Sequence, residues 1–223
     1  MNSADPVTDP WAGYRVEDAW RRALVYLLVC MGLGLLSGAL GSALDHPLGD
    51  DPSTGFWLWT AACAAVIVLG YWVIWPMGTL THGRALVPSA TVFGILWGIA
   101  EGTAFAAAWY AADRGLERWF SSPWPAIGVT FLLLSAYLGL WHQFYWDLKV
   151  SPEHNIEAWN MRKVVLVHVP NLVITLPFLA FTDAVAVFIA LQTLGLVGAA
   201  RAMAFPGFPG MAPVMGSLRG ARK

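Results

Sequence analysis

The sequence contains few charged residues for its length. Asp, Glu, Lys and Arg make up 12% of its 223 residues, about half the share found in a soluble domain. This shortage argues against a chain whose whole surface lies in water. The formal net charge of −1 also excludes the broad basic field with which nucleic-acid-binding proteins attract phosphate. We therefore expect no nucleic-acid partner.

Cysteine is scarce as well. Cys30 and Cys63 are far apart, and each lies in an apolar run. They cannot form a secreted disulfide framework or a clustered metal knuckle, so we expect both to be buried as small apolar side chains. The first 20 residues also lack the basic stretch and early apolar core of a signal peptide. The first apolar run is therefore predicted to be a retained helix.

Long apolar runs are what the sequence has in abundance. Six of them approach the roughly 20 residues that a helix needs to cross a bilayer. They cover residues 23–44, 55–78, 86–112, 124–145, 164–181 and 184–205. We predict an all-α, polytopic membrane protein with a six-transmembrane-helix bundle over residues 23–205, a cytoplasmic N-terminal segment (1–22) and a flexible cytoplasmic tail (206–223).

The basic residues set the predicted orientation. If the N-terminus is inside, Arg114 and Arg118 are the only two of the 13 Lys and Arg residues on the outer side. Positively charged residues concentrate in the cytoplasmic loops of membrane proteins. We predict a multi-pass protein of the cell membrane with both termini in the cytoplasm.

Small residues mark a packing face in the third run. Gly94, Gly98 and Gly102 recur every four residues, a pattern that lets helix backbones approach closely. We expect a helix–helix partner on this face. In the fifth run, Pro170 and Pro177 are predicted to interrupt and kink the helix.

Glu101 lies near the middle of the third run. An ionised carboxylate at that depth costs at least about 2.5 kcal/mol, and acids inside membrane spans are commonly functional. We expect Glu101 to be neutral at pH 7, to line a pocket with Trp97 and Phe105, and to donate a proton. The alternative is a structural hydrogen bond to a neighbouring helix, which is the role predicted for Gln192 in the sixth run. Asp183, in the turn before that run, is predicted to cap its helix.

Polar and aromatic side chains are interleaved between residues 141 and 171. Ser151, Pro152 and Glu153 form a typical helix start, which predicts a short interfacial helix over 152–161 on the cytoplasmic surface. His, Asp and Glu are the usual groups for proton transfer. The predicted catalytic residues are Glu101, His142, Asp147 and His168, and the predicted substrate-binding residues are Trp97, Phe105, Tyr145, Glu153, His154, Asn155 and Asn171.

Two cofactor hypotheses compete with acid–base chemistry for this stretch. His142, His154 and His168 could ligate a metal together with Asp147 or Glu153, although their spacing matches no familiar local motif. His142 and His168 could instead be the axial ligands of a haem. In a third, structural interpretation these residues only tie the surface helix to the bundle. The sequence identifies no cofactor.

Three functional classes are consistent with these features. The first is an integral membrane enzyme that acts on an apolar, lipid-like substrate (an isoprenoid, sterol or lipid) by acid–base chemistry of a cyclase or isomerase type, with its site open to the cytoplasmic face. The second is a transporter or ion pathway, although the two halves of the sequence show no matching motifs. The third is a non-catalytic subunit of a membrane complex. We expect the first, with membrane lipid and a hydrophobic small molecule as partners.

Overall fold

The structure, a computed structural model, describes residues 16–49, 52–75, 88–141 and 163–202, and every regular element in those ranges is a helix. The elements are α1 (Val16–Ser37), α2 (Ala39–Asp45), α3 (Thr54–Ile67), η1 (Val68–Ile74), α4 (Pro88–Leu116), α5 (Trp124–Ala136), η2 (Tyr137–Trp141), η3 (Val164–His168), α9 (Val169–Thr182) and α10 (Val185–Ala202). Each apolar run is therefore helical over nearly all of its described residues, which confirms the all-α prediction for them.

Three of the described helices are long and apolar enough to cross a membrane. They cover Thr54–Ile74, Thr91–Leu116 and Val164–Thr182, and the bent pair of α1 and α2 gives a fourth if it is counted as one span. Trp124–Gly139 and Val185–Ala200 are shorter apolar helices. The chain therefore has the composition and helix lengths of a membrane protein. The interfacial helix predicted over 152–161 lies outside the described residues.

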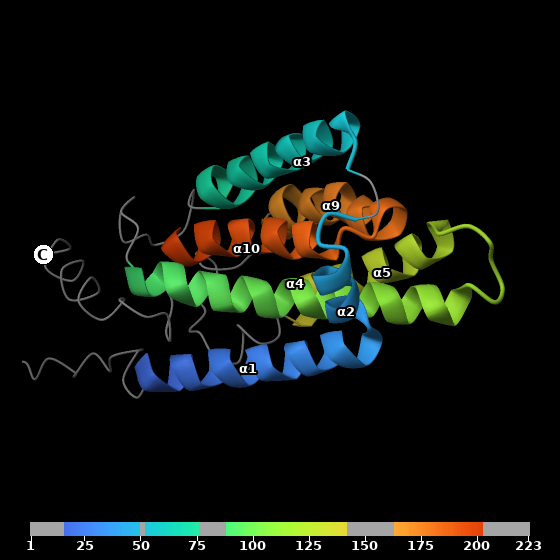
Figure 1. Cartoon of the computed structure of the whole chain (residues 1–223). Coiled ribbons are helices and arrows are strands. Elements are labelled where there is room, and N and C mark those ends of the chain that lie inside the picture. Colours follow the sequence, from blue (N-terminus) through green and yellow to red (C-terminus); the bar gives the residue numbers. More distant parts are fainter. Residues whose placement is uncertain (1–15, 50–51, 76–87, 142–162, 203–223) are drawn as a thin grey trace, which may run out of the picture.

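Helix α4 is the centre of the bundle. It lies between α1 on one side and α10 on the other, with α3 and α9 beyond α10 (Figure 1). The glycine stripe of α4 makes the contact with α10 close, because a Cβ on Gly98 would lie 2.5 Å from the Cα of Thr193 and one on Gly94 would lie 2.8 Å from the Cα of Val197. The predicted packing face is thus occupied by α10 of the same chain.

The sequence predicted one helix for the first apolar run, but the structure divides this run into two helices. Helix α1 ends at Ser37, and α2 leaves it at an angle of 81°. The residue between them, Gly38, has φ +83°, a left-handed conformation that glycine adopts without steric cost. A Cβ at this position would also lie 2.8 Å from the guanidinium of Arg114. The apolar part of α1, Ala23–Ser37, is a candidate membrane span only when it is counted together with α2.

Within the described ranges, three helices contain π-helical segments, and all three segments lie toward the end of the bundle opposite α2. We call this the π end and the other the α2 end. In η1 the Trp75 N–H donates to the Gly70 carbonyl, 2.7 Å away and five residues back. In η3 the Val169 N–H donates to the Val164 carbonyl in the same way. Pro170 directly follows this wide turn, which accommodates a ring that would clash in a regular helix. Pro177 lies inside α9.

Candidate functional site

Glu101 is buried in the middle of the bundle. Its side chain is 5% exposed, and Trp97, one turn earlier on α4, is its side-chain hydrogen-bonding neighbour. It lies within electrostatic range of three phenols from three other helices: Tyr26 of α1, Tyr71 of η1 and Tyr137 of η2. No Lys or Arg among the described residues offsets its charge. A bare carboxylate would be costly here, so this environment favours the protonated acid.

Four aromatic rings surround the Glu101 position. The rings of Tyr26 and Trp97 lie 4.6 Å apart, and the Phe105 ring meets the Tyr137 ring edge-on at 6.0 Å. The hydroxyl groups of Tyr26 and Tyr137 are hydrogen-bonded at 3.2 Å, which connects the two pairs of rings. The structure therefore brings Glu101 together with both aromatic residues predicted for its site, and it adds two tyrosines.

A second polar group lies next to this ring set and connects η1, η3 and α9. The Tyr71 hydroxyl and His168 Nδ1 share a hydrogen bond of 2.7 Å. Asn171 Nδ2 lies 3.4 Å from the same hydroxyl. All three side chains are at most 4% exposed. Tyr71 thus links the two predicted site residues His168 and Asn171 to the surroundings of Glu101.

The polar group continues into α10 through Gln192. Asn171 Nδ2 donates to Gln192 Oε1 at 2.7 Å, and Gln192 Nε2 donates to Thr175 Oγ1 at 3.0 Å. The Thr175 hydroxyl itself donates to the Asn171 carbonyl at 2.7 Å. The prediction that Gln192 forms an interhelical hydrogen bond is confirmed.

The buried group extends toward the π end through an amino–aromatic contact. The Lys163 amino group lies 4.8 Å from the centre of the Trp75 ring, over its face, a cation–π arrangement. The Trp75 ring in turn meets the His168 imidazole edge-on at 5.2 Å. Lys163 is 4% exposed. A cation and an imidazole are therefore held one after the other on the path from the π end to Tyr71.

The π-helical segments account for the placement of these groups. Tyr71, Tyr137 and His168 each belong to one of η1, η2 and η3. Segments of this kind are rare and frequently occur at functional sites. Close packing assists, because Gly70 has no side chain and a Cβ there would lie 3.1 Å from the Val167 side chain of η3. The wide turns of η1 and η3 thus bring Tyr71 and His168 into contact.

The described residues contain only part of the predicted site. Glu101, Trp97 and Phe105 form one cluster, and His168 and Asn171 belong to the adjoining polar group. The other predicted residues lie outside the described ranges: His142, Tyr145, Asp147, Glu153, His154 and Asn155. The sequence analysis missed the tyrosines at positions 26, 71 and 137. The feature that could have identified them is a tyrosine, which carries a polar hydroxyl group, in the interior of an apolar run.

The metal hypothesis depends on His168, which the structure describes, and on residues outside the described ranges. Within the described ranges, no three His, Cys, Asp or Glu side chains are grouped so that they could hold a metal ion. His168 is described, and its Nδ1 is hydrogen-bonded to Tyr71. His142 and His154, the other two proposed ligands, lie in the range 142–162.

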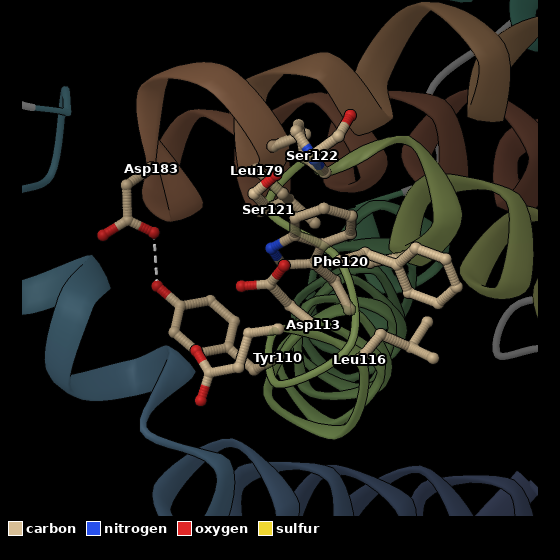
Figure 2. A pocket seen from close by; sticks show the side chains of 13 residues that line it. Tyr110, Asp113, Leu116, Phe120, Ser121, Ser122, Leu179 and Asp183 are labelled. Carbon is tan, nitrogen blue, oxygen red and sulfur yellow. Dashed lines mark hydrogen bonds between the residues drawn. The ribbon is translucent and has the colours of Figure 1, made fainter.

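A cavity of about 360 Å³ lies at the α2 end, away from Glu101. Figure 2 shows the Tyr110 hydroxyl turned toward Asp183 at its edge, with Asp113 and Phe120 along the wall. Its 13 lining residues include three acids, the third being Glu117, and no Lys or Arg. The cavity is anionic, and it is not the pocket that was predicted beside Glu101.

Asp183 does not cap α10, so this prediction was wrong. The residue follows the end of α9 with φ 51°, and its carboxylate accepts hydrogen bonds from Ser42 at 2.7 Å and from Tyr110. Side chains of α2 and α4 are thereby joined to the turn between α9 and α10. The group is a structural clasp at one end of the cavity.

Comparisons of the chain with protein-family models, with curated proteins and with solved structures gave no match.

Proposed function

We propose that this chain is an integral membrane enzyme that protonates an apolar, lipid-like substrate, with Glu101 as the general acid. The observation that carries the proposal is the position of Glu101: a carboxyl group 5% exposed, among four aromatic rings, with no cation among the described residues to offset its charge. An acid in such a place is held in the form that can donate a proton.

The surrounding rings suit the intermediate that protonation of a hydrocarbon produces. Transfer of the Glu101 proton to an alkene carbon breaks the π bond and leaves a carbocation, whereas transfer to an epoxide oxygen opens a C–O bond. Aromatic faces stabilise a desolvated cation by about 2 kcal/mol or more, and Tyr26, Trp97 and Phe105 supply such faces. Loss of a proton from the adjacent carbon to a water molecule or a base other than Glu101 completes an isomerisation or cyclisation. The Glu101 carboxylate must then take up one proton, so that the cycle makes no net change in protons.

The substrate would be a membrane isoprenoid, sterol or other lipid that enters from the bilayer. Its polar head would lie toward the π end, where His168 and Asn171 offer hydrogen bonds and where His142, Tyr145, Asp147, Glu153, His154 and Asn155 are proposed to contribute. We propose that this end faces the cytoplasm. The supporting observation is the distribution of Lys and Arg, which also supports both termini inside. The six apolar runs support six spans and a location in the cell membrane.

A second candidate function is a proton or ion pathway. Its supporting observation is the buried hydrogen-bonded series from His168 through Tyr71, Asn171 and Gln192 to Thr175. Buried polar series of this kind carry protons in membrane pumps and transporters. The series runs from the π end toward the middle of the bundle. This geometry suits delivery of protons to Glu101 as well as transport of protons across the membrane.

The enzyme hypothesis can be tested without knowledge of the substrate. The purified protein would be incubated with a total lipid extract in D2O, and products would be screened by mass spectrometry for deuterium bound to carbon. We expect new deuterated lipids with the wild type and at least a 100-fold loss with Glu101→Gln, because a general acid contributes about 10²–10⁴ in rate.

The matched control is Glu117→Gln, which makes the same change at an exposed acid of the α2 end. It should retain wild-type turnover. Wild-type deuteration by a well-folded Glu101→Gln protein would remove Glu101 from the mechanism. Lipid deuteration that is absent in all proteins, together with proton flux into dye-loaded vesicles, would favour the pathway function.

A further inference from the structure

One buried acceptor in the polar group has no described partner. Asn171 is 2% exposed, and its Oδ1 accepts no hydrogen bond from the residues that the structure describes. Leaving a buried carbonyl oxygen unsatisfied costs about 1–3 kcal/mol. In native proteins such atoms are commonly satisfied by an internal water with two to four polar partners.

The position of Asn171 places this acceptor close to the Glu101 site. Its amide nitrogen contacts both Tyr71 and Gln192. Gln192 lies against α4 beside Glu101, because its Cβ would be 3.3 Å from a Cβ on Gly102. Tyr71 is itself within electrostatic range of Glu101. Donors and acceptors from η1, α9 and α10 therefore converge on one level of α4.

We propose that a water molecule held by Asn171 Oδ1 bridges Glu101 and Tyr71, and that Tyr71 and His168 resupply the Glu101 proton from the π end. This inference rests on the proposed role of Glu101 as a proton donor. It assigns Tyr71 and Asn171 a role in regenerating the acid after each transfer, in addition to holding the polar group together.

The transfer is balanced at each atom. The water gives one proton to the Glu101 carboxylate and takes the hydroxyl proton of Tyr71. Tyr71 is restored by the proton on His168 Nδ1, across the 2.7 Å hydrogen bond. His168 takes up a proton at Nε2 from the π end, and exchange between its two neutral tautomers then restores the proton on Nδ1 before the next transfer. One proton enters at His168 for each proton that Glu101 receives, and no bond other than O–H and N–H bonds is made or broken.

Tyr26 provides an internal comparison. Like Tyr71, it is a phenol within electrostatic range of Glu101, although it is only partly buried. Its hydroxyl is paired with the Tyr137 hydroxyl at 3.2 Å, whereas the Tyr71 hydroxyl is bonded to an imidazole. If electrostatic proximity alone mattered, removal of either hydroxyl would have the same effect on Glu101. The proposed route requires only that of Tyr71.

The experiment follows the Glu101 proton directly, without substrate. In infrared spectra of the purified protein, the carbonyl stretch of the protonated acid is assigned by its loss in Glu101→Gln, and its hydrogen–deuterium exchange is timed after transfer to D2O. Tyr71→Phe and Asn171→Leu should each slow this exchange at least tenfold. Tyr26→Phe should leave it within about twofold of the wild-type rate. Amide exchange in the same spectra monitors opening of the fold.

Three results would overturn the route: an unchanged exchange rate in Tyr71→Phe, equal slowing in Tyr26→Phe, or no carbonyl band that depends on Glu101. Failure of the proposed enzyme function is separate, because it is measured by deuteration of lipid carbon. A protein with the expected exchange pattern and no lipid product would keep the proton route and lose the enzyme.

Discussion

Asp183 at the α2 end and Glu101 in the middle of the bundle are carboxylates in opposite surroundings. Asp183 at the α2 end is half-buried and accepts hydrogen bonds from hydroxyl groups of Ser42 and Tyr110. Glu101 in the middle is almost fully buried, among rings and beside one indole. The hydroxyl donors around Asp183 stabilise a negative charge on its carboxylate. The apolar surroundings of Glu101 make a negative charge on its carboxylate unfavourable.

The comparison distinguishes a structural acid from a candidate catalytic acid. The partners of Asp183 come from α2 and α4, so its hydrogen bonds connect these helices to the turn between α9 and α10. The partners of Glu101 are mostly apolar faces, which add little stability to an ionised side chain. Substitutions that change one side chain at a time should therefore separate the two regions by their effects on stability.

The largest effect should come from filling the α4–α10 contact on which the Glu101 level depends. In Gly98→Leu the new side chain meets the backbone of Thr193, since a Cβ alone would lie 2.5 Å from its Cα. We expect a loss of at least about 3 kcal/mol in unfolding free energy, because overpacking against backbone cannot relax. Thermal unfolding in detergent measures it. Gly128→Leu, at an exposed glycine with nothing within 4 Å, should remain as stable as the wild type.

Gln192→Leu should have the next largest effect, because it removes the link between α9 and α10. The change breaks the bonds to Asn171 and Thr175 and should cost about 1–2 kcal/mol. The neighbouring Thr193→Val is the control, since its hydroxyl bonds only to Ile189 of its own helix. Denaturation by SDS titration compares the pair. Equal stability of the two variants would show that the polar group contributes little to the fold.

Asp183→Asn should weaken the clasp at the α2 end by about 1 kcal/mol, because two charge-assisted hydrogen bonds become neutral ones. Asparagine tolerates the left-handed backbone found here. Asp113→Asn on the same cavity wall should not destabilise, since it relieves a like-charge i,i+4 pair with Glu117. A clasp variant as stable as the wild type in thermal scans would contradict this role.

Glu101→Gln should have the smallest effect on stability, within about 0.5 kcal/mol, because the amide has nearly the same shape and no charge to bury. The same isosteric change would then cost more at the half-buried acid than at the fully buried one. Thermal unfolding of both variants in one detergent makes the comparison. A large loss of stability in Glu101→Gln would mean that Glu101 is an ionised structural partner.

The sequence predicted the features that depend on composition along a single helix. Hydropathy located all six runs that are helical where described, and the spacing of Gly94, Gly98 and Gly102 predicted close packing without naming α10 as the partner. Gln192 was correctly interpreted because a lone amide in a span must find a partner nearby. The Glu101 cluster was predicted in part, because Trp97 and Phe105 lie one turn to either side.

Features that depend on contacts between helices could not be predicted in this way. The break at Gly38 was missed because nothing local distinguishes it from Gly34, and the contact with Arg114 lies far along the chain. The Tyr71–His168 hydrogen bond spans 97 positions, and no hydropathy pattern reports which spans are neighbours. Asp183 was misassigned since its partners, Ser42 and Tyr110, are supplied by other helices.

The three π-helical segments have an evolutionary consequence. A π turn holds one residue more than the α-helical turn it replaces, so it can be gained or lost by a single-codon insertion or deletion. Removal of one residue from Val68–Ile74 or Val164–His168 would close the wide turn into an α-helical one. It would turn the side chains of that turn relative to the rest of the helix by up to about 100°, which would separate Tyr71 from His168. Related chains that keep this contact should therefore show no one-residue gaps here, whereas a lineage that has lost it could align with a gap of one position in either segment.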